Sequence, residues 1–209
     1  NFNGGTATGN GMWKFNGVTA NYNVAAFPTV FEYYDGSTIN SSFNPIANNH
    51  TLQINYNNTI AANILNNDTI RVSHYGNYVN GIMTSVASSI LSVEGSYYHS
   101  DITFNTDFTN NGLVELRSIS GYQSGLYMTT PKIFTNAAAA TFKNWLGIYA
   151  TTRTIGGSFV NNGNFIVDVS LIHTNASSTS VNTGSISIAT GQPYTVNNGI
   201  YNFNGGTAT

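Results

Sequence analysis

Short runs in which apolar and polar residues alternate recur along the chain. Residues 69–72, 113–117, 165–169 and 185–189 are clear examples, and glycine or asparagine residues punctuate them. In one of these runs, Val114 and Leu116 are separated by Glu115 and followed by Arg117. An alternation with a period of two places apolar side chains on one face of a β-strand. The pattern therefore predicts an all-β protein with many short strands.

One stretch of the sequence favours a helix. Residues 136–146 include four consecutive alanines at 137–140, and alanine has the highest helix propensity of all residues. Residues 60–65 are a weaker candidate. The sequence therefore predicts at most one short helix, near residues 136–146.

Asparagine and glycine provide the recurring turns between the predicted strands. The triplet Asn-Asn-Gly occurs three times, and each copy precedes a segment that contains apolar residues. Asparagine and glycine tolerate left-handed backbone conformations, and asparagine side chains bond to nearby backbone. The predicted turn residues are Asn110, Asn111, Gly112, Asn161, Asn162, Gly163, Asn197, Asn198 and Gly199.

Two folds are compatible with short strands joined by tight turns. Asn-Gly between alternating strands is a strong hairpin signal, which favours an antiparallel β-sandwich or jelly roll. Asn-Gly turns also form the corners of a parallel β-helix or β-solenoid. We predict a solenoid-like unit and keep the antiparallel sandwich or jelly roll as the alternative.

The first eight residues of the chain reappear unchanged as its last eight. The octapeptide Asn-Phe-Asn-Gly-Gly-Thr-Ala-Thr occupies residues 1–8 and 202–209, an offset of 201 residues (202 minus 1). An identity of this length indicates a tandem repeat. We expect residues 1–209 to be one unit of about 201 residues with an eight-residue overlap, taken from a longer protein. The junction residues are Asn1, Phe2, Asn3, Gly4 and Gly5 in the first copy and Asn202, Phe203, Asn204, Gly205 and Gly206 in the second.

A solenoid period of this length gives an expected size. Strands in neighbouring coils lie about 4.8 Å apart. At roughly 20–25 residues per coil, one unit would contain about eight to ten coils and advance by about 40–50 Å. Stacked units would bury each other's open strand edges, and asparagine side chains at the turns would stack as ladders.

Composition narrows the classes of function. Charged residues make up only 7% of the chain and the net charge is −2, whereas an average soluble domain has roughly 25% charged residues. A basic nucleic-acid-binding surface is therefore excluded, and no apolar run reaches the roughly 20 residues of a membrane-spanning helix. The chain has 32 asparagines, 21 glycines and no cysteine, so disulfides and thiolate metal sites are also excluded.

Reading the end of the chain into its beginning, as the repeat implies, gives a continuous β-like segment. Residues 195–209 followed by 9–17 combine Asn-Gly turns, short Thr/Val strands and a Gly-Gly-Thr-Ala-Thr-Gly-Asn-Gly run. This segment resembles the stalks of secreted right-handed β-helix adhesins, in the style of autotransporter passengers and filamentous haemagglutinins. The resemblance covers roughly residues 1–20 and 100–209, while residues 21–100 match it poorly. We therefore expect residues 21–100 to be an irregular or inserted part. It implies an extracellular stalk or fibre and carries over no catalytic residues.

Residues that could carry chemistry are few and scattered. Two pairs of acids are close in sequence, Glu32 with Asp35 and Asp101 with Asp107. The carboxyls of a glycosidase must lie about 5–10 Å apart, and nothing in the sequence requires that geometry. The four histidines lack a metal-binding spacing, and calcium-loop and phosphate-loop motifs are absent. We therefore expect neither an enzyme nor a cofactor or metal site.

Aromatic residues and sequons mark candidate surface features. The tyrosine pairs at 33–34 and 97–98 would each direct one ring inward and one outward, because adjacent strand residues face opposite sides. Five Asn-X-Ser/Thr sequons would mark an exposed, glycosylated face in a host that glycosylates secreted proteins, although chance explains them equally well in so Asn-rich a chain. The candidate surface aromatics are Tyr33, Tyr34, Tyr97 and Tyr98, and the sequons start at Asn40, Asn49, Asn57, Asn67 and Asn175.

These observations lead to three hypotheses. The first is a structural repeat of a filament, stalk or sheath outside the cell or on its surface, whose partners are its own axial neighbours. The second is an adhesin or carbohydrate-binding module that contacts surface glycans, and an aromatic row on one solvent face would favour it. The third is a carbohydrate-active β-helix enzyme, which would need a cleft with paired carboxylates.

Overall fold

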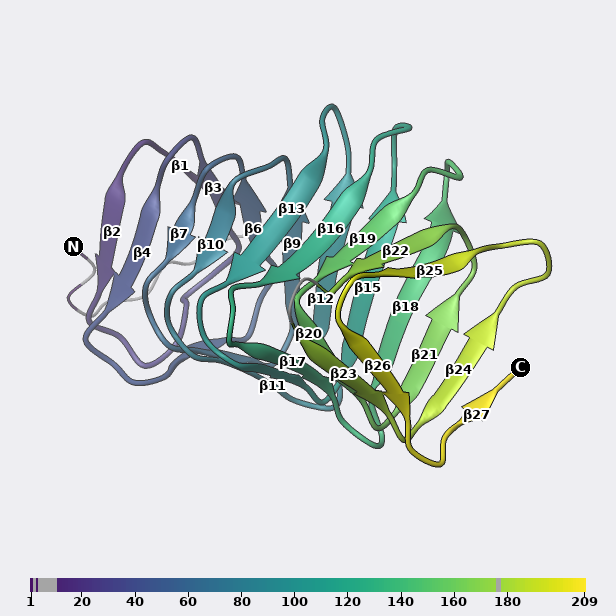
Figure 1. Cartoon of the computed structure of the whole chain (residues 1–209). Coiled ribbons are helices and arrows are strands. Elements are labelled where there is room, and N and C mark those ends of the chain that lie inside the picture. The colour runs from purple at the N-terminus through teal and green to yellow at the C-terminus, as the bar shows by residue number, and fades with distance from the viewer. Residues whose placement is uncertain (2, 4–10, 176–177) are drawn as a thin grey trace.

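The chain forms a parallel β-solenoid, seen in a computed structural model, in which the backbone coils repeatedly around one axis (Figure 1). The structure describes residues 1, 3, 11–175 and 178–209. Within them, 27 strands form three sheets of ten, nine and eight strands. The chain advances steadily along the axis, from purple to yellow in Figure 1.

The ten-stranded sheet contains one strand from every coil. Each of its strands pairs with the strand one coil further on. Its strands are β1 (Trp13–Asn16), β3 (Phe31–Tyr34), β6 (Leu52–Asn55), β9 (Thr69–Ser73), β12 (Ile90–Gly95), β15 (Leu113–Ser118), β18 (Thr141–Gly147), β21 (Asn164–Val167), β24 (Ser185–Ile188) and β27 (Thr207–Ala208).

The other two sheets complete each coil. The nine-stranded sheet contains β2 (Thr19–Tyr22), β4 (Thr38–Ser41), β7 (Thr59–Ile60), β10 (Asn77–Val79), β13 (Ser100–Phe104), β16 (Ser124–Met128), β19 (Arg153–Gly156), β22 (Leu171–Thr174) and β25 (Tyr194–Asn197). The eight-stranded sheet contains β5 (Ile46–Asn48), β8 (Ile64–Asn66), β11 (Met83–Ser85), β14 (Phe108–Asn110), β17 (Ile133–Asn136), β20 (Ser158–Asn161), β23 (Thr179–Asn182) and β26 (Ile200–Phe203). The chain runs from the ten- to the nine- to the eight-stranded sheet, and we call the three bends the first, second and third corners in that order.

Strand pairing confirms the solenoid and shows that the antiparallel alternative is wrong. The paired strands are parallel in all three sheets. Coils differ in length, and in the ten-stranded sheet Trp13 and its partner Phe31 span a short coil, whereas Val114 and its partner Phe142 span a long one. The solenoid has about nine turns, within the predicted eight to ten coils.

Residues 21–100 follow the same order of sheets as the rest of the chain. They contain the strands from β3 to β12, and these pair in register with their neighbours. The first coil differs in the eight-stranded sheet, where Ala26 forms an isolated parallel bridge to Ala47.

The alanine-rich stretch is not helical, and the described part of the chain contains no helix. Residues 136–146 hold the end of β17, a tight turn and most of β18, and the amide of Ala140 donates to the carbonyl of Ala137 (2.9 Å) in that turn. Phe142 and Asn144 then face inward while Lys143 faces outward. The strand alternation after the alanines therefore prevails over their helix propensity. Residues 60–65 likewise belong to β7, β8 and the turn between them.

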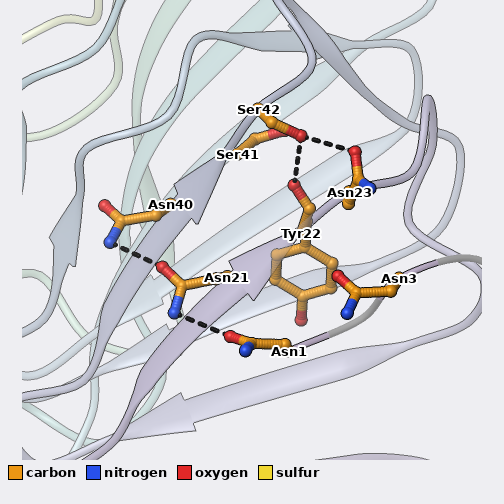
Figure 2. Close-up of a pocket in the computed structure, with 8 residues that line it drawn as sticks. All are labelled: Asn1, Asn3, Asn21, Tyr22, Asn23, Asn40, Ser41 and Ser42. Atoms are coloured by element: carbon orange, nitrogen blue, oxygen red, sulfur yellow. Dashed lines mark hydrogen bonds between the residues drawn. The ribbon is translucent and has the colours of Figure 1, made fainter.

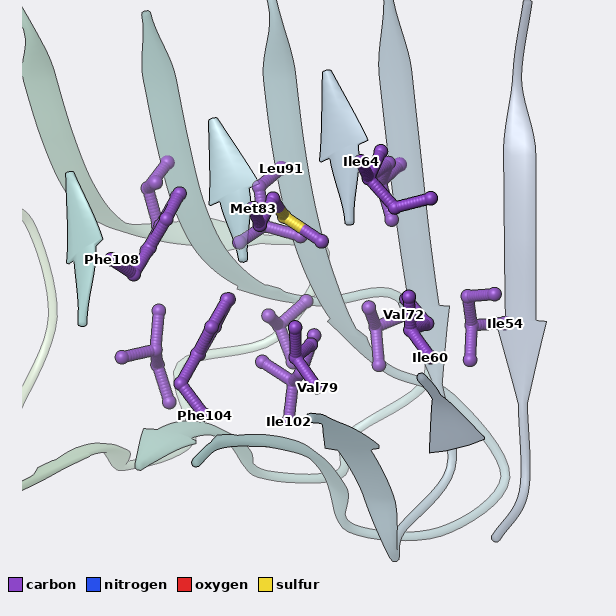
Figure 3. Packing of buried hydrophobic residues seen from close by; sticks show 14 of the residues in the cluster. Ile54, Ile60, Ile64, Val72, Val79, Met83, Leu91, Ile102, Phe104 and Phe108 are labelled. Carbon is purple, nitrogen blue, oxygen red and sulfur yellow. The ribbon is translucent and has the colours of Figure 1, made fainter. Parts of the chain in front are cut away.

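The core is built in layers, one from each coil (Figure 3). One coil contributes Ile54, Ile60 and Ile64 from β6, β7 and β8, and all three are buried. The alternation of the sequence directs these residues inward, because every second side chain of a strand points toward the interior. The solenoid therefore has a continuous apolar centre along its length.

Phenylalanines fill the core of the C-terminal half in a continuous stack. The ring centroids of Phe104 and Phe108 are 4.5 Å apart, and those of Phe108 and Phe134 are 5.5 Å apart. Phe134 stacks in turn on Phe159 at 5.1 Å and meets Phe142 edge-on at 5.6 Å. Such contacts add about 0.5–1.5 kcal/mol each beyond the burial of apolar area.

A ladder of buried asparagines runs along the third corner. The side chain of Asn110 donates to Asn136 (2.9 Å), Asn136 donates to Asn161 (2.8 Å), and Asn161 donates to Asn182 (2.7 Å). Each bond joins an Nδ2 to the Oδ1 of the next coil. The ladder confirms that asparagines stack at the turns. In register, its positions are Asn48, Asn66, Ser85, Asn110, Asn136, Asn161 and Asn182.

The Asn-Asn-Gly triplets lie at two different corners. Those ending in Gly112 and Gly163 form third corners, between β14 and β15 and between β20 and β21. A Cβ on Gly112 would lie 2.3 Å from the carbonyl oxygen of Ser89, and one on Gly163 would lie 2.2 Å from that of Ala137. Glycine is required there because the neighbouring coil passes so close. The third triplet forms a second corner between β25 and β26, where Gly199 has a φ of +70°.

Candidate functional surfaces

The second copy of the repeated octapeptide is part of the last coil. Phe203 pairs with Asn182 at the end of β26, and Thr207 pairs with Ser185 at the start of β27. Asn202 also lies in β26, and Asn204, Gly205 and Gly206 form the third corner that follows. This copy therefore belongs to the folded strand ladder.

The first copy of the octapeptide is described only in part. Asn1 and Asn3 line a hollow at the N-terminal end of the solenoid. The predicted junction residues Phe2, Gly4 and Gly5 lie outside the described residues.

This N-terminal hollow, of about 440 Å³, is lined by amides and hydroxyls (Figure 2). The side-chain amide of Asn40 donates to Asn21, and that of Asn21 donates to Asn1, both at 3.1 Å. Ser42 donates to Asn23 at 2.7 Å. These bonds form a second, exposed asparagine ladder along the nine-stranded sheet.

Both ends of the solenoid expose apolar side chains and open strand edges. Ile200 and Phe203 in the last coil are 58% and 61% exposed, and Met12 and Trp13 are exposed at the other end. Among the described strands, β25, β26 and β27 each end their sheet. Open edges of this kind can pair with further strands.

A row of aromatic rings follows the first corner over four successive coils. Tyr56 follows β6, His74 and Tyr75 follow β9, Tyr98 follows β12, and Tyr122 follows β15. We call these five residues the tyrosine corner. Tyr56 and Tyr75 also pair through their hydroxyls at 2.5 Å. The sequence carries a signal for this row, because the tyrosines at positions 56, 75, 98 and 122 recur with a spacing close to the length of one coil.

The predicted tyrosine pairs are only partly at the surface. Tyr34 is half-buried and faces outward, but Tyr33 faces inward and is fully buried, so its prediction as a surface aromatic is wrong. Its hydroxyl meets that of Tyr22, and burial raises the pKa of both. Tyr97 and Tyr98 are both exposed. The predicted inward ring is absent from this second pair because both residues lie in the corner after β12, where strand alternation no longer applies.

The outer face of the ten-stranded sheet carries charges that pair between coils. Arg117 contacts both Glu94 and Glu115, and the indole nitrogen of Trp145 donates to Glu115 at 3.1 Å. Lys143 lies 5.1 Å from the centroid of the Trp145 ring. The Arg117–Glu94 pair and the Trp145–Glu115 bond each join neighbouring coils, and the side chains of both glutamates are largely buried.

The acids that are close in sequence are engaged separately in the structure. Glu32 pairs with Lys14 (2.9 Å), and Asp35 lies exposed at the first corner. Asp101 accepts the amide of Gly76 (2.8 Å) and pairs with His99 (3.5 Å), whereas Asp107 accepts the amide of Ile133 (2.9 Å). Burial raises the pKa of Asp101. Glu32, Asp101 and Asp107 therefore have structural partners within the chain.

Arg153 anchors the loop between β18 and β19 from inside the solenoid. Its guanidinium donates to the carbonyls of Trp145 (3.2 Å), Leu146 (3.2 Å), Tyr149 (3.1 Å) and Thr151. The side chain is fully buried, and burial lowers its pKa to about 10, so it remains charged at neutral pH. Carbonyls of the loop and of the end of β18 thus stabilise this cation where a carboxylate would usually do so.

His173 is a second buried polar group, in β22. Its Nε2 donates to the carbonyl of Gly157 (2.8 Å), and its Nδ1 lies within hydrogen-bond distance of the Tyr194 hydroxyl (3.0 Å). A neutral imidazole protonated on Nε2 satisfies both contacts, since the Tyr194 hydroxyl can donate to Nδ1. Burial lowers the pKa of His173, while the Gly157 carbonyl opposes that shift.

We expect this histidine to make the fold less stable in mild acid. A folded-state pKa below the unfolded value of about 6.5 gives a stability that is complete above that pH and is lost as the pH falls below it. Urea unfolding at about pH 7.5 and about pH 5 measures this loss, and His173→Gln, which can still donate to Gly157, should show less of it. Equal losses in both proteins would assign the effect to other groups, such as His74, whose pKa burial also lowers.

The five sequons differ in their accessibility. Asn49 and Asn57 are exposed, and Asn40 and Asn67 are half-buried with side chains that donate to Asn21 and Asn49. Asn175 is fully buried, and its amide donates to the carbonyl of Ile200 at 2.9 Å. The folded chain therefore has no accessible amide at this fifth sequon.

The described residues contain neither a metal-binding cluster nor a membrane-spanning helix. No group of three or more His, Asp or Glu side chains in this part of the chain could hold a metal ion. Within the same residues, no helix is long and apolar enough to cross a membrane. In comparisons with known proteins, the chain matches no family model, no curated protein and no solved structure.

Proposed function

We propose that the chain is a repeat unit of a fibre or stalk, located outside the cell or on its surface, that is built from tandem β-solenoid units. The role is mechanical and includes no catalytic step. One observation carries the proposal: the second octapeptide copy lies in the ladders that join β23 to β26 and β24 to β27. A repeat boundary inside a ladder lets successive units share one continuous stack of strands. The extracellular location is carried over from the resemblance of the junction segment to secreted stalks.

In a continuous array, β1 and β27 would compete for one place in the ten-stranded sheet. Ala208 corresponds to residue 7 of the next unit (208 minus 201), and Trp13 follows only six residues later. Even a short coil, such as the one from Trp13 to its partner Phe31, spans 18 residues (31 minus 13), which is three times as many. The junction therefore has room for one coil, and either the octapeptide or β1 provides its strand in this sheet.

This junction coil sets the length of the unit. The eight strands of the ten-stranded sheet from β3 to β24 give eight coils, and the junction adds a ninth. A period of 201 residues divided among nine coils is about 22 residues per coil, between the short coil from Trp13 to Phe31 and the long one from Val114 to Phe142. With strands about 4.8 Å apart, each unit would advance by about 43 Å.

A chain of two units, residues 1–209 followed by a second copy of residues 9–209, tests the proposal. We expect one continuous rod that exceeds the single unit by about 43 Å, measured by small-angle X-ray scattering and cryo-electron microscopy. The two-unit chain should also unfold at a higher denaturant concentration, because the junction buries two exposed end coils.

The matched control replaces both candidate junction strands, residues 202–209 and Trp13–Asn16 of the second unit, with Gly/Ser segments of equal length. This chain should behave as two bodies joined by a flexible linker. Two independently moving bodies in the unaltered two-unit chain would contradict the proposal. So would a three-unit chain whose added length differs from that of the second unit.

A further inference from the structure

We propose that the tyrosine corner binds an extended, neutral polysaccharide. The corner lies within a single chain, so the inference holds whether or not units join in tandem. Glycan contact would give the unit a second function beside its mechanical one.

The rings of the corner form a continuous row. The centroids of Tyr56 and Tyr75 are 4.7 Å apart, and Tyr98 lies 6.3 Å from both Tyr75 and Tyr122. Tyr98 is 57% exposed, and Tyr75 and Tyr122 are also exposed. Contiguous exposed aromatics mark interaction sites, and tyrosine offers a large contact area at a small loss of conformational entropy.

A hollow of about 350 Å³ adjoins the row and adds polar groups to it. Its lining consists of Asn16, Tyr34, Asp35, Tyr56, His74 and Tyr98. The amide, carboxylate and hydroxyl groups of this set can bond to sugar hydroxyls along the edge of a stacked ring. The hollow therefore combines aromatic rings on which a sugar can stack with polar groups that can bond to its hydroxyls.

The charges at the corner exclude anionic ligands. The lining includes one carboxylate and no lysine or arginine. Lys14 lies 5.8 Å from the centroid of the Tyr34 ring, but it is paired with Glu32 at 2.9 Å. An acidic polysaccharide or a nucleic acid would find no unpaired cation here and would be repelled by Asp35. A neutral glycan is not affected in this way.

The spacing of the row suits a linear chain of sugars. A sugar ring has polar edges and apolar C–H faces, and its C–H groups pack well on the negative face of an aromatic ring. Coils repeat about every 4.8 Å, which is comparable to the length of one pyranose ring in an extended polysaccharide. A chain parallel to the solenoid axis would therefore meet about one aromatic position per sugar.

Affinity electrophoresis and calorimetry with soluble polysaccharides test the inference. Hydroxyethylcellulose, laminarin and galactomannan serve as neutral probes, and heparin serves as the anionic one. We expect the intact chain to bind a neutral probe, and the double variant Tyr75→Ala/Tyr98→Ala to lose about tenfold or more in affinity. The single variant Tyr122→Ala, at the far end of the row, should lose less.

The matched control is Tyr78→Ala, because Tyr78 is similarly exposed but lies on the nine-stranded sheet, outside the row. It should bind as the intact chain does, and unfolding midpoints of all variants verify that each is folded. Failure to bind any neutral probe, binding to heparin alone, or an equal loss in the control would overturn the inference. So would a self-association of the intact chain, seen by sedimentation, that the double variant abolishes, because the row would then be an interface between copies. None of these results alters the length measured for the two-unit rod.

Discussion

Replacing Phe134 by alanine is expected to destabilise the solenoid by about 3–5 kcal/mol. Phe134 is fully buried and lies at the centre of the phenylalanine stack, in contact with the rings of Phe108, Phe142 and Phe159. The substitution removes apolar area and leaves a cavity that the rigid strand ladders cannot close. Urea unfolding, followed by circular dichroism, measures the loss.

The control for this prediction is the neighbouring residue on the same strand. Ile133 is 39% exposed, so Ile133→Ala should have a much smaller effect. Since coils contact mainly their neighbours, hydrogen exchange in the Phe134 variant should accelerate first in β14, β17 and β20. Equal destabilisation by the two substitutions would show that the stack does not hold the core together.

Asn136→Asp is expected to destabilise the fold by a similar amount, about 3–5 kcal/mol at neutral pH. The buried amide of Asn136 donates to Asn161 (2.8 Å) and to the carbonyl of Asn164 (3.0 Å), and it accepts from Asn110 (2.9 Å). A carboxylate would lose both donated bonds and place a negative charge against their acceptors. Unfolding free energies of the variant and the parent chain measure the effect.

The pH dependence separates this mechanism from a simple loss of packing. Burial would raise the pKa of the new carboxyl in the folded state, so the penalty should grow as the pH rises through that raised value and shrink in acid. Asn105→Asp, in the exposed pair with Asn80, is the control and should change stability by less than about 0.5 kcal/mol. A penalty at Asn136 that is independent of pH would contradict the assignment.

The alternation of the sequence was sufficient to predict the strands and their inward faces. In β15, Val114 and Leu116 are buried while Glu115 and Arg117 face outward, as the period of two requires. The direction of pairing could not be read from the turns, because Asn-Gly suits both hairpins and solenoid corners. The spacing of the buried asparagines contains that information, since Asn110, Asn136, Asn161 and Asn182 recur at intervals of about one coil and align only in parallel coils.

Local signals failed where the three-dimensional register decides the structure. The alanines at 137–140 favour a helix in isolation, but the flanking strands are held in both ladders, which leaves only a tight turn between them. Tyr97 and Tyr98 could not be placed because the end of β12 is not marked in the sequence. The local sequence does not predict the tyrosine corner for a related reason. Its members can be recognised as neighbours only when the length of each coil is known.

The tyrosine corner spans four of about nine coils, and this partial coverage has a consequence for a tandem array. Each unit would present one short patch, separated from the next by coils without such rings. A polysaccharide long enough to reach two patches would bind the second at a high effective concentration, which can raise the overall avidity by about 10²–10⁴. The avidity of such a fibre for the polysaccharide would then depend on the number of its units. Losing repeats would weaken adhesion without any change in the individual site.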